Sequence, residues 1–215
     1  MIKKLQFAVI TVGFLMIMFY SRSAYADAGV PMIFITYPAM LLALIPIILI
    51  EAVIIERQLR LGFGKTIRCV GIANAASTIV GFPLTWFVWA AFEMAFIHGG
   101  YLLYKFHFIG EGFSPADTWG RILSVILFTP WLVADEQHIY WMIPAAAIVG
   151  FIPAFFVSVW IERSILRRLC KTIDKPVIDR TTWTANVVSY MLLFIIAVAW
   201  LVKGLLTKKI GLLGL

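Results

Sequence analysis

Four stretches of the sequence are apolar over lengths that can cross a lipid bilayer. They cover residues 30–55, 69–97, 139–161 and 185–202. A transmembrane helix needs about 20 consecutive residues that are mostly apolar. Only 13% of the 215 residues are charged, whereas about 25% are charged in a typical soluble domain. The chain is therefore predicted to be an all-α integral membrane protein with four transmembrane helices.

A segment with the pattern of a signal peptide precedes these four spans. Two lysines at residues 3–4 are followed by an apolar run over residues 5–20 and by Ala-Tyr-Ala at residues 24–26. Small residues in this spacing are read by signal peptidase. The favoured interpretation is that residues 1–26 are a cleaved signal peptide, and the alternative is a short uncleaved helix. In both cases Asp27 is predicted to lie on the outer side of the membrane.

The basic residues predict how the four spans are oriented. Ten of the eighteen Lys and Arg residues fall in two segments, residues 57–68 and 163–180. Cytoplasmic loops collect Lys and Arg, so both segments are predicted to face the cytoplasm. Residues 98–138 contain two basic residues and are predicted to lie outside. The C-terminal tail also falls outside, although it carries three lysines.

A further apolar stretch, residues 122–134, is too short to cross a bilayer. Since both of its ends are predicted to lie outside, we expect a re-entrant or interface-lying helix there. Four units follow from this layout: residues 1–26 are the signal segment, 27–97 the first transmembrane hairpin, 98–138 the outer loop with the short helix, and 139–215 the second transmembrane hairpin.

The two hairpins share an ordered set of sequence features. In each, a proline (Pro38, Pro144) is followed 18 residues later by Glu-Arg, then by Lys-Thr-Ile, and then by Ala-Asn-x-x-Ser at residues 73–77 and 185–189. This order predicts an internal repeat of two parallel hairpins, related by an axis along the membrane normal. In the register given by the two Glu-Arg pairs, the position that corresponds to Glu51 is the apolar Val157, so Glu51 is not part of the repeated pattern.

Two carboxylates lie inside predicted spans. Glu51 comes six residues before Arg57, and Glu93 lies about one turn from the outer end of the second span. Ionisable groups within spans are costly and usually face the protein interior. The favoured interpretation of Glu51 is a packing anchor that hydrogen-bonds to a neighbouring helix. The alternative is a group that handles a proton or a cation.

Small and hydroxyl side chains occupy one face of the second span. They recur at i, i+3, i+4, i+7 and i+11: Asn74, Ser77, Thr78, Gly81 and Thr85. Asn186 and Ser189 begin the corresponding face of the last span. Such residues let transmembrane helices approach closely and hydrogen-bond across the contact. Helix packing is the favoured interpretation, and a polar path for a solute is the alternative.

The histidines and cysteines give little support for a metal or redox site. His98, His107 and His138 are all predicted to lie outside, where they could gather around a metal ion or a haem, but no HxxxH or HExxH spacing is present. The two cysteines, Cys69 and Cys170, lie beside predicted cytoplasmic loops, where a structural disulfide is not expected. The sequence predicts no cofactor.

Several segments, among them "LIPIILIEA", "ANAASTIVGFPLTW" and "YWMIPAA", resemble a family of small, uncharacterised bacterial multi-pass inner-membrane proteins. The resemblance implies a bacterial membrane protein and supplies no activity and no site residue.

The parts outside the spans are too short for a catalytic domain, and they contain no GxGxxG, Walker or GxSxG motif. The sequence therefore favours a non-enzymatic inner-membrane protein that acts as a subunit, scaffold or assembly factor of an envelope complex. The alternative is a small transporter or channel that uses the intramembrane carboxylates, and the second alternative is a redox, metal or haem protein that uses the histidines. The expected partners are the lipid bilayer and either other proteins or further copies of the chain. The net charge of +7 is attributed to topology and not to binding of nucleic acid.

Overall fold

The computed structural model describes residues 30–105, 118–132 and 137–212. In chain order, the elements are β1 (Val30–Pro31), α2 (Ile33–Leu59), α3 (Phe63–Ala76), η1 (Ser77–Gly81), α4 (Phe82–Lys105), α5 (Thr118–Leu127), β2 (Trp131–Leu132), α6 (Ile139–Leu169) and α7 (Lys175–Leu212). The predicted signal segment and His107 lie outside the described residues.

Within the described ranges, four helical stretches are long and apolar enough to cross a membrane. They are Ile33–Leu59, Phe63–Gly99, Ile139–Leu169 and Lys175–Thr207. The prediction of an all-α multi-pass membrane protein is therefore confirmed. Each helical stretch also extends beyond the apolar run that revealed it, because the basic residues that flank a span at the loop end belong to the same helix.

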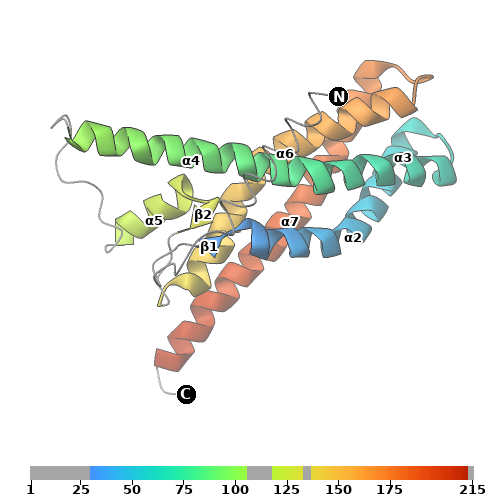
Figure 1. The fold of residues 1–215 in the computed structure, drawn as a ribbon. Coiled ribbons are helices and arrows are strands. Elements are labelled where there is room, and N and C mark those ends of the chain that lie inside the picture. Colours follow the sequence, from blue (N-terminus) through green and yellow to red (C-terminus); the bar gives the residue numbers. More distant parts are fainter. Residues whose placement is uncertain (1–29, 106–117, 133–136, 213–215) are drawn as a thin grey trace.

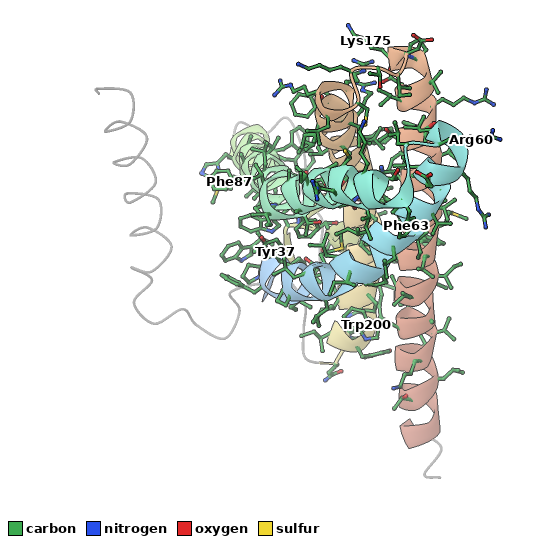
Figure 2. The ribbon with its side chains drawn as sticks, turned by 90° about the vertical axis from the view of Figure 1, so that its right-hand side faces the viewer. Tyr37, Arg60, Phe63, Phe87, Lys175 and Trp200 are labelled. Atoms are coloured by element: carbon green, nitrogen blue, oxygen red, sulfur yellow. The ribbon has the colours of Figure 1, made fainter. Side chains whose placement is uncertain are left out.

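The four spans form two helical hairpins that pack against each other. α2 pairs with α3 and α6 pairs with α7, while α2 also contacts α7 and α3 also contacts α6. The two connecting loops, residues 60–62 and 170–174, lie at the same end of the molecule, which we call the loop end (Figure 1). Figure 2 shows Arg60 and Lys175 on this side, with Trp200 further along α7. β1, β2 and α5 lie toward the opposite end, which we call the strand end (Figure 1).

The second span contains a π-helical turn, η1, between α3 and α4. Pro83 lies one residue into α4, where its ring would clash with the carbonyl of residue 79 in a regular α-helix. A π-turn widens the helix by one residue per turn and removes such a clash. η1 contains Ser77, Thr78 and Gly81, so this irregular turn supplies three residues of the polar face that the sequence predicted.

Different side chains hold the two loops at the loop end. Glu56 accepts hydrogen bonds from the Gly62 backbone N–H (3.1 Å) and from the Thr66 hydroxyl (2.5 Å). Gly62 has a φ of 88°, a left-handed conformation that glycine adopts without strain. In the other hairpin, Arg167 forms a two-pronged ion pair with Asp179, with Nε 2.7 Å from Oδ1. The loop end is therefore tied by side chains in both hairpins.

The strand end corrects one prediction. Residues 122–134 do not form one helix, because α5 ends at Leu127 and the chain then turns into β2, which pairs antiparallel with β1. Pro130 explains the end of the helix, since proline has no N–H to donate and restricts the residue before it. The Pro130 carbonyl accepts the Met32 N–H (3.0 Å) and the Trp86 indole N–H (2.9 Å). These bonds fasten the segment to α2 and α4.

Three buried apolar clusters follow one another along the bundle. The loop-end cluster is built around Ala52, Ile55, Leu59, Cys69, Val70, Ala73, Leu166, Cys170, Ile178 and Ala185. The middle cluster contains Met40, Ile47 and Leu193, with Ala43, Phe82 and Phe151 packed against them. The strand-end cluster contains Met32, Val125, Leu132, Met142, Ala146 and Ala147.

The two free cysteines give a testable consequence of this packing. Burial and the neighbouring Cys69 thiol raise the pKa of Cys170, which directly follows α6, to about 11. Alkylating reagents attack the thiolate, so the rate of Cys170 modification by iodoacetamide should rise about tenfold per pH unit from pH 8 to pH 10. Peptide mass spectrometry of the native protein measures this rate. Glutathione in the same series should level off near pH 9, and a Cys170 rate that levels off with it would contradict the shift.

Candidate functional site

Two carboxylates from different hairpins meet inside the bundle. Glu51 of α2 is 1% exposed and Glu162 of α6 is 2% exposed, and the two lie close together because Asn74 and Ser77, one turn apart on the second span, each bond to one of them. The sequence identified Glu51 as an intramembrane candidate. It missed Glu162, because this residue directly precedes Arg163 and therefore looked like the polar end of its span. In the structure α6 continues to Leu169, which places Glu162 well inside the helix.

Glu51 accepts hydrogen bonds from two other helices. The Asn74 side-chain amide of α3 donates to Oε2 over 2.7 Å, and the Ser189 hydroxyl of α7 donates to Oε1 over 2.6 Å. Asn74 belongs to the same hairpin as Glu51, whereas Ser189 belongs to the other. The carboxylate therefore joins the two hairpins.

Glu162 has the same arrangement with the hairpins exchanged. The Asn186 amide of its own hairpin donates to Oε2 over 2.6 Å, and the Ser77 hydroxyl of the other hairpin donates to Oε1 over 2.7 Å. All four carboxylate oxygens thus have a side-chain donor. We call these six residues the polar cluster: Glu51, Asn74, Ser77, Glu162, Asn186 and Ser189.

Helical spacing explains how each hairpin supplies its two donors. Asn74 and Ser77 are three residues apart, as are Asn186 and Ser189, so each pair lies on one face of its helix. The predicted faces are buried in the structure, including Thr78 and Thr85 further along the second span. Polar groups in a lipid-surrounded interior need partners, and here the carboxylates provide them.

The contacts match Glu51 with Glu162 and not with Val157. Each glutamate is bonded to an asparagine that follows it in its own hairpin, 23 residues later in one case and 24 in the other. The register taken from the Glu-Arg pairs differs from this correspondence, because it aligned Glu162 with Glu56. Glu56 lies at the loop end, where it binds Thr66, and it makes no comparable contact.

One polar atom of the cluster has no partner among the described residues. Asn186 Oδ1 is buried and accepts no hydrogen bond, although the nitrogen of the same amide donates to Glu162 and to the Thr182 carbonyl (3.1 Å). A buried acceptor without a donor costs about 1–3 kcal/mol. A proton-bearing group or a water next to Glu162 would satisfy it.

Like charges face each other in the polar cluster. Neither glutamate forms an ion pair with a described Lys or Arg; the ion pair that the structure shows joins Arg167 and Asp179 at the loop end. Two adjacent carboxylates in a low-dielectric interior cannot both stay ionised without a counter-charge, and sharing a proton converts the repulsion into a hydrogen bond. Asparagine and serine donors already lie within 2.7 Å of all four oxygens. This favours a proton over a hard metal ion, which needs about six to eight oxygen ligands.

Apolar residues close the polar cluster on both sides. On α2, Ile47 of the middle cluster and Ile55 of the loop-end cluster lie one turn before and one turn after Glu51. On α7, Ala185 and Leu193 are placed in the same way around Ser189. The carboxylate pair is therefore shielded from both ends of the bundle.

The other predicted candidates are not part of the polar cluster. Glu93 lies at the strand end, where its Oε2 accepts the Trp131 backbone N–H over 3.1 Å. His98 contacts the backbone of its own helix (2.9 Å), and His138 is the N-cap residue of α6. In the described part of the chain, no three His, Cys, Asp or Glu side chains are placed to hold a metal ion.

Comparison of the chain with protein-family models, with curated proteins and with solved structures gives no match. The resemblance to a bacterial membrane-protein family therefore stays a prediction. The geometry of the polar cluster is the basis for the function proposed below.

Proposed function

We propose that this protein is a small membrane transporter that binds and releases a proton at the Glu51–Glu162 pair. The observation that carries the proposal is that two buried carboxylates from different hairpins are held side by side by the same asparagine and serine pairs, and neither has a cationic partner among the described residues. As a packing element alone, such a pair is costly, because each ionised group has to leave water and repel the other. As a site for an exchangeable proton, the same arrangement is well suited.

The position of the pair supports alternating access. Each carboxylate is bonded to both hairpins, so a rocking movement of one hairpin against the other would separate the carboxylates and change which end of the bundle they face. Transporters built from structural repeats place their sites at the repeat interface in this way. We infer that the two hairpins are an internal parallel repeat in the register that matches Glu51 with Glu162. Because the middle cluster and the loop-end cluster pack on the two sides of the pair, the structure then represents an occluded state.

The charge distribution gives this transporter an orientation. The loop end carries ten of the eighteen basic residues, in residues 57–68 and 163–180. By the positive-inside rule the loop end faces the cytoplasm and the strand end faces outward. We also propose that the membrane is the bacterial inner membrane and that residues 1–26 are a signal peptide.

The test is whether the pair binds a proton. Infrared difference spectra of the reconstituted protein, recorded between acid and alkaline buffer, should show the carbonyl band of a buried carboxylic acid that titrates. The band should vanish in the double variant Glu51→Gln/Glu162→Gln. It should persist in the control Glu56→Gln, because Glu56 lies at the loop end, bound to the Thr66 hydroxyl.

A flux measurement completes this test. Proton uptake by proteoliposomes after an acid pulse should fall at least about tenfold in either single variant, because a glutamine side chain cannot take up and release the transported proton. A double variant whose spectrum and flux equal those of the unmodified protein would show that the carboxylates are packing elements.

A subunit or assembly factor of a membrane complex is the second candidate function. One observation favours it: α4 and α6 border a groove of about 730 Å³ whose walls are apolar, with Phe92, Phe156 and Trp160 exposed along it. A transmembrane helix of another protein fits such a groove. Purification in mild detergent, followed by mass spectrometry, would support this role by recovering stoichiometric partners. A lone homo-oligomer would favour the transporter.

A further inference from the structure

A separate cavity lies between the polar cluster and the strand end. It has a volume of about 40 Å³ and is bordered by α2, α4, α6 and the turn before β2. We call it the chamber and define it by the residues that the argument uses: Thr36, Thr85, Trp86, Trp89, Thr129 and Gly150. Since a water needs about 10–15 Å³ on this measure, the chamber has room for roughly three waters or a ligand of a few heavy atoms.

The chamber and the carboxylate pair are bordered by two of the same helices, α2 and α6, at different heights along the bundle. Thr85 comes eight residues after Ser77 on the same helical stretch, and Gly150 comes twelve residues before Glu162 on α6. At about 1.5 Å per residue, the chamber lies roughly 12–18 Å from the polar cluster along these helices. Phe82 and Phe151 of the middle cluster line the chamber and separate it from the pair.

Small residues on α6 create the space. Gly150 lies opposite the turn that carries Thr129, and a Cβ added to it would be 3.6 Å from Thr129 Cγ2, an ordinary contact. Ala146 and Ala154 lie one turn to either side and also line the cavity. In many membrane bundles small residues bring helices into contact, whereas here they leave a gap against the bulky Trp86 and Trp89.

The walls can accept hydrogen bonds but have few hydrogens left to donate. The hydroxyls of Thr36, Thr85 and Thr129 each donate to a carbonyl of their own helix or turn, over 2.7, 2.7 and 2.5 Å. A hydroxyl that has donated its hydrogen offers only lone pairs. The Trp86 indole N–H is likewise bonded to the Pro130 carbonyl. A ligand that hydrogen-bonds to these three threonines must therefore supply the donor.

Aromatic rings favour a cation in the chamber. No charged residue of either sign lines it, and aromatic rings of α4 form one wall, where the face of a ring attracts a small cation. Glu93 lies one turn beyond Trp89 on the same face of α4, toward the strand end, and is 4% exposed. The Glu51–Glu162 pair lies on the other side. The chamber is thus placed between two buried acidic sites.

We infer that the chamber binds a small protonated amine, ammonium or methylammonium, as the substrate that is exchanged against the proton of the carboxylate pair. This inference rests on the proposed transport function. The ammonium group donates its hydrogens to the threonine oxygens and lies against the indole rings. Tetramethylammonium has the same charge but no hydrogen to donate and is too bulky, so the chamber rejects it.

Binding of radiolabelled methylammonium to the full-length protein, measured by scintillation proximity in detergent, tests the inference. Unlabelled ammonium should compete, whereas tetramethylammonium should not. Gly150→Leu fills the chamber and should weaken binding at least tenfold. Gly71→Leu is the matched control, because a Cβ at Gly71 meets nothing within 4 Å, and it should bind normally. Thr85→Val removes one acceptor and should weaken binding about fivefold, by the loss of one hydrogen bond of about 1 kcal/mol.

The infrared band of the carboxylate pair separates the two proposals. Methylammonium binding that is lost in Gly150→Leu, while this variant keeps the band, supports the chamber as the substrate site. No binding by the unmodified protein that has the band would overturn the chamber and leave the proton site intact. Equal binding by Gly150→Leu would also overturn it. Absence of both binding and band would overturn both proposals.

Discussion

Replacing Glu162 by leucine should lower the free energy of unfolding by about 3 kcal/mol, because one amide hydrogen of Asn186 loses its acceptor and the Ser77 hydroxyl keeps only the longer bond to the Asn74 carbonyl (3.1 Å). The Ser77 hydroxyl and the Asn186 amide both point at this carboxylate, at 2.7 and 2.6 Å. Neither can turn to water, since both residues are almost completely buried. A loss of this size should lower the thermal unfolding midpoint in detergent by about 6–12 °C for a chain of this length, followed by circular dichroism.

Glu162→Gln is the matched control for the leucine variant. Glutamine keeps the shape and one acceptor oxygen, so we expect a loss of about 1 kcal/mol. The sign of the leucine effect decides which force dominates the polar cluster. A leucine variant that is more stable than the unmodified protein would show that repulsion between the carboxylates exceeds the gain from their hydrogen bonds, and it would contradict the prediction.

Replacing Gly204 by alanine should cost about 2 kcal/mol, the second-largest effect that we expect. A Cβ at Gly204 would lie 2.7 Å from the Tyr140 carbonyl oxygen, and this oxygen belongs to the backbone of α6. A backbone carbonyl cannot rotate away as a side chain can, so α6 and α7 have to separate near the strand end. Equilibrium unfolding in mixed micelles measures the loss.

Gly81→Ala provides the comparison. Its Cβ would lie even closer to a neighbouring atom, 2.6 Å from Ile161 Cδ1, but that atom is the tip of a flexible side chain. We expect a loss below about 1 kcal/mol, because isoleucine can change its rotamer. Both substitutions gain the same helix propensity from alanine, so this gain cancels in the comparison. Equal losses at the two glycines would mean that the α6–α7 contact is not the constraint that the structure shows.

The spans and the polar faces could be predicted because they depend on local properties of the chain. Apolar length alone located the four spans, and the three-residue spacing of Asn74 and Ser77 placed both on one face. Glu162 could not be recognised in this way. Its neighbour Arg163 looked like the end of a span, but a long basic side chain can lie along the helix and reach the interface while the helix continues.

The pairing between hairpins is not a local property, and this is why the sequence did not predict that Glu51 and Glu162 have corresponding contacts. Ser77 and Glu162 are 85 residues apart, and no spacing rule within either hairpin connects them. The short outer helix failed for a simpler reason. Its apolar composition continued past residue 127, whereas Pro130 ends the helix and lets the chain pair with β1.

The bond between Glu51 and Ser189 spans 138 residues and so imposes an order on how the protein is made. When α2 and α3 enter the bilayer, Glu51 has only Asn74 to bind, and its second donor arrives with α7. Until then one oxygen of a buried acidic group lacks its donor, so we expect the partial chain to be less stable than the complete one. The carboxylate pair is present once α6 has inserted, but only α7 brings Ser189 and Asn186, so the polar cluster is complete when the last span is in place.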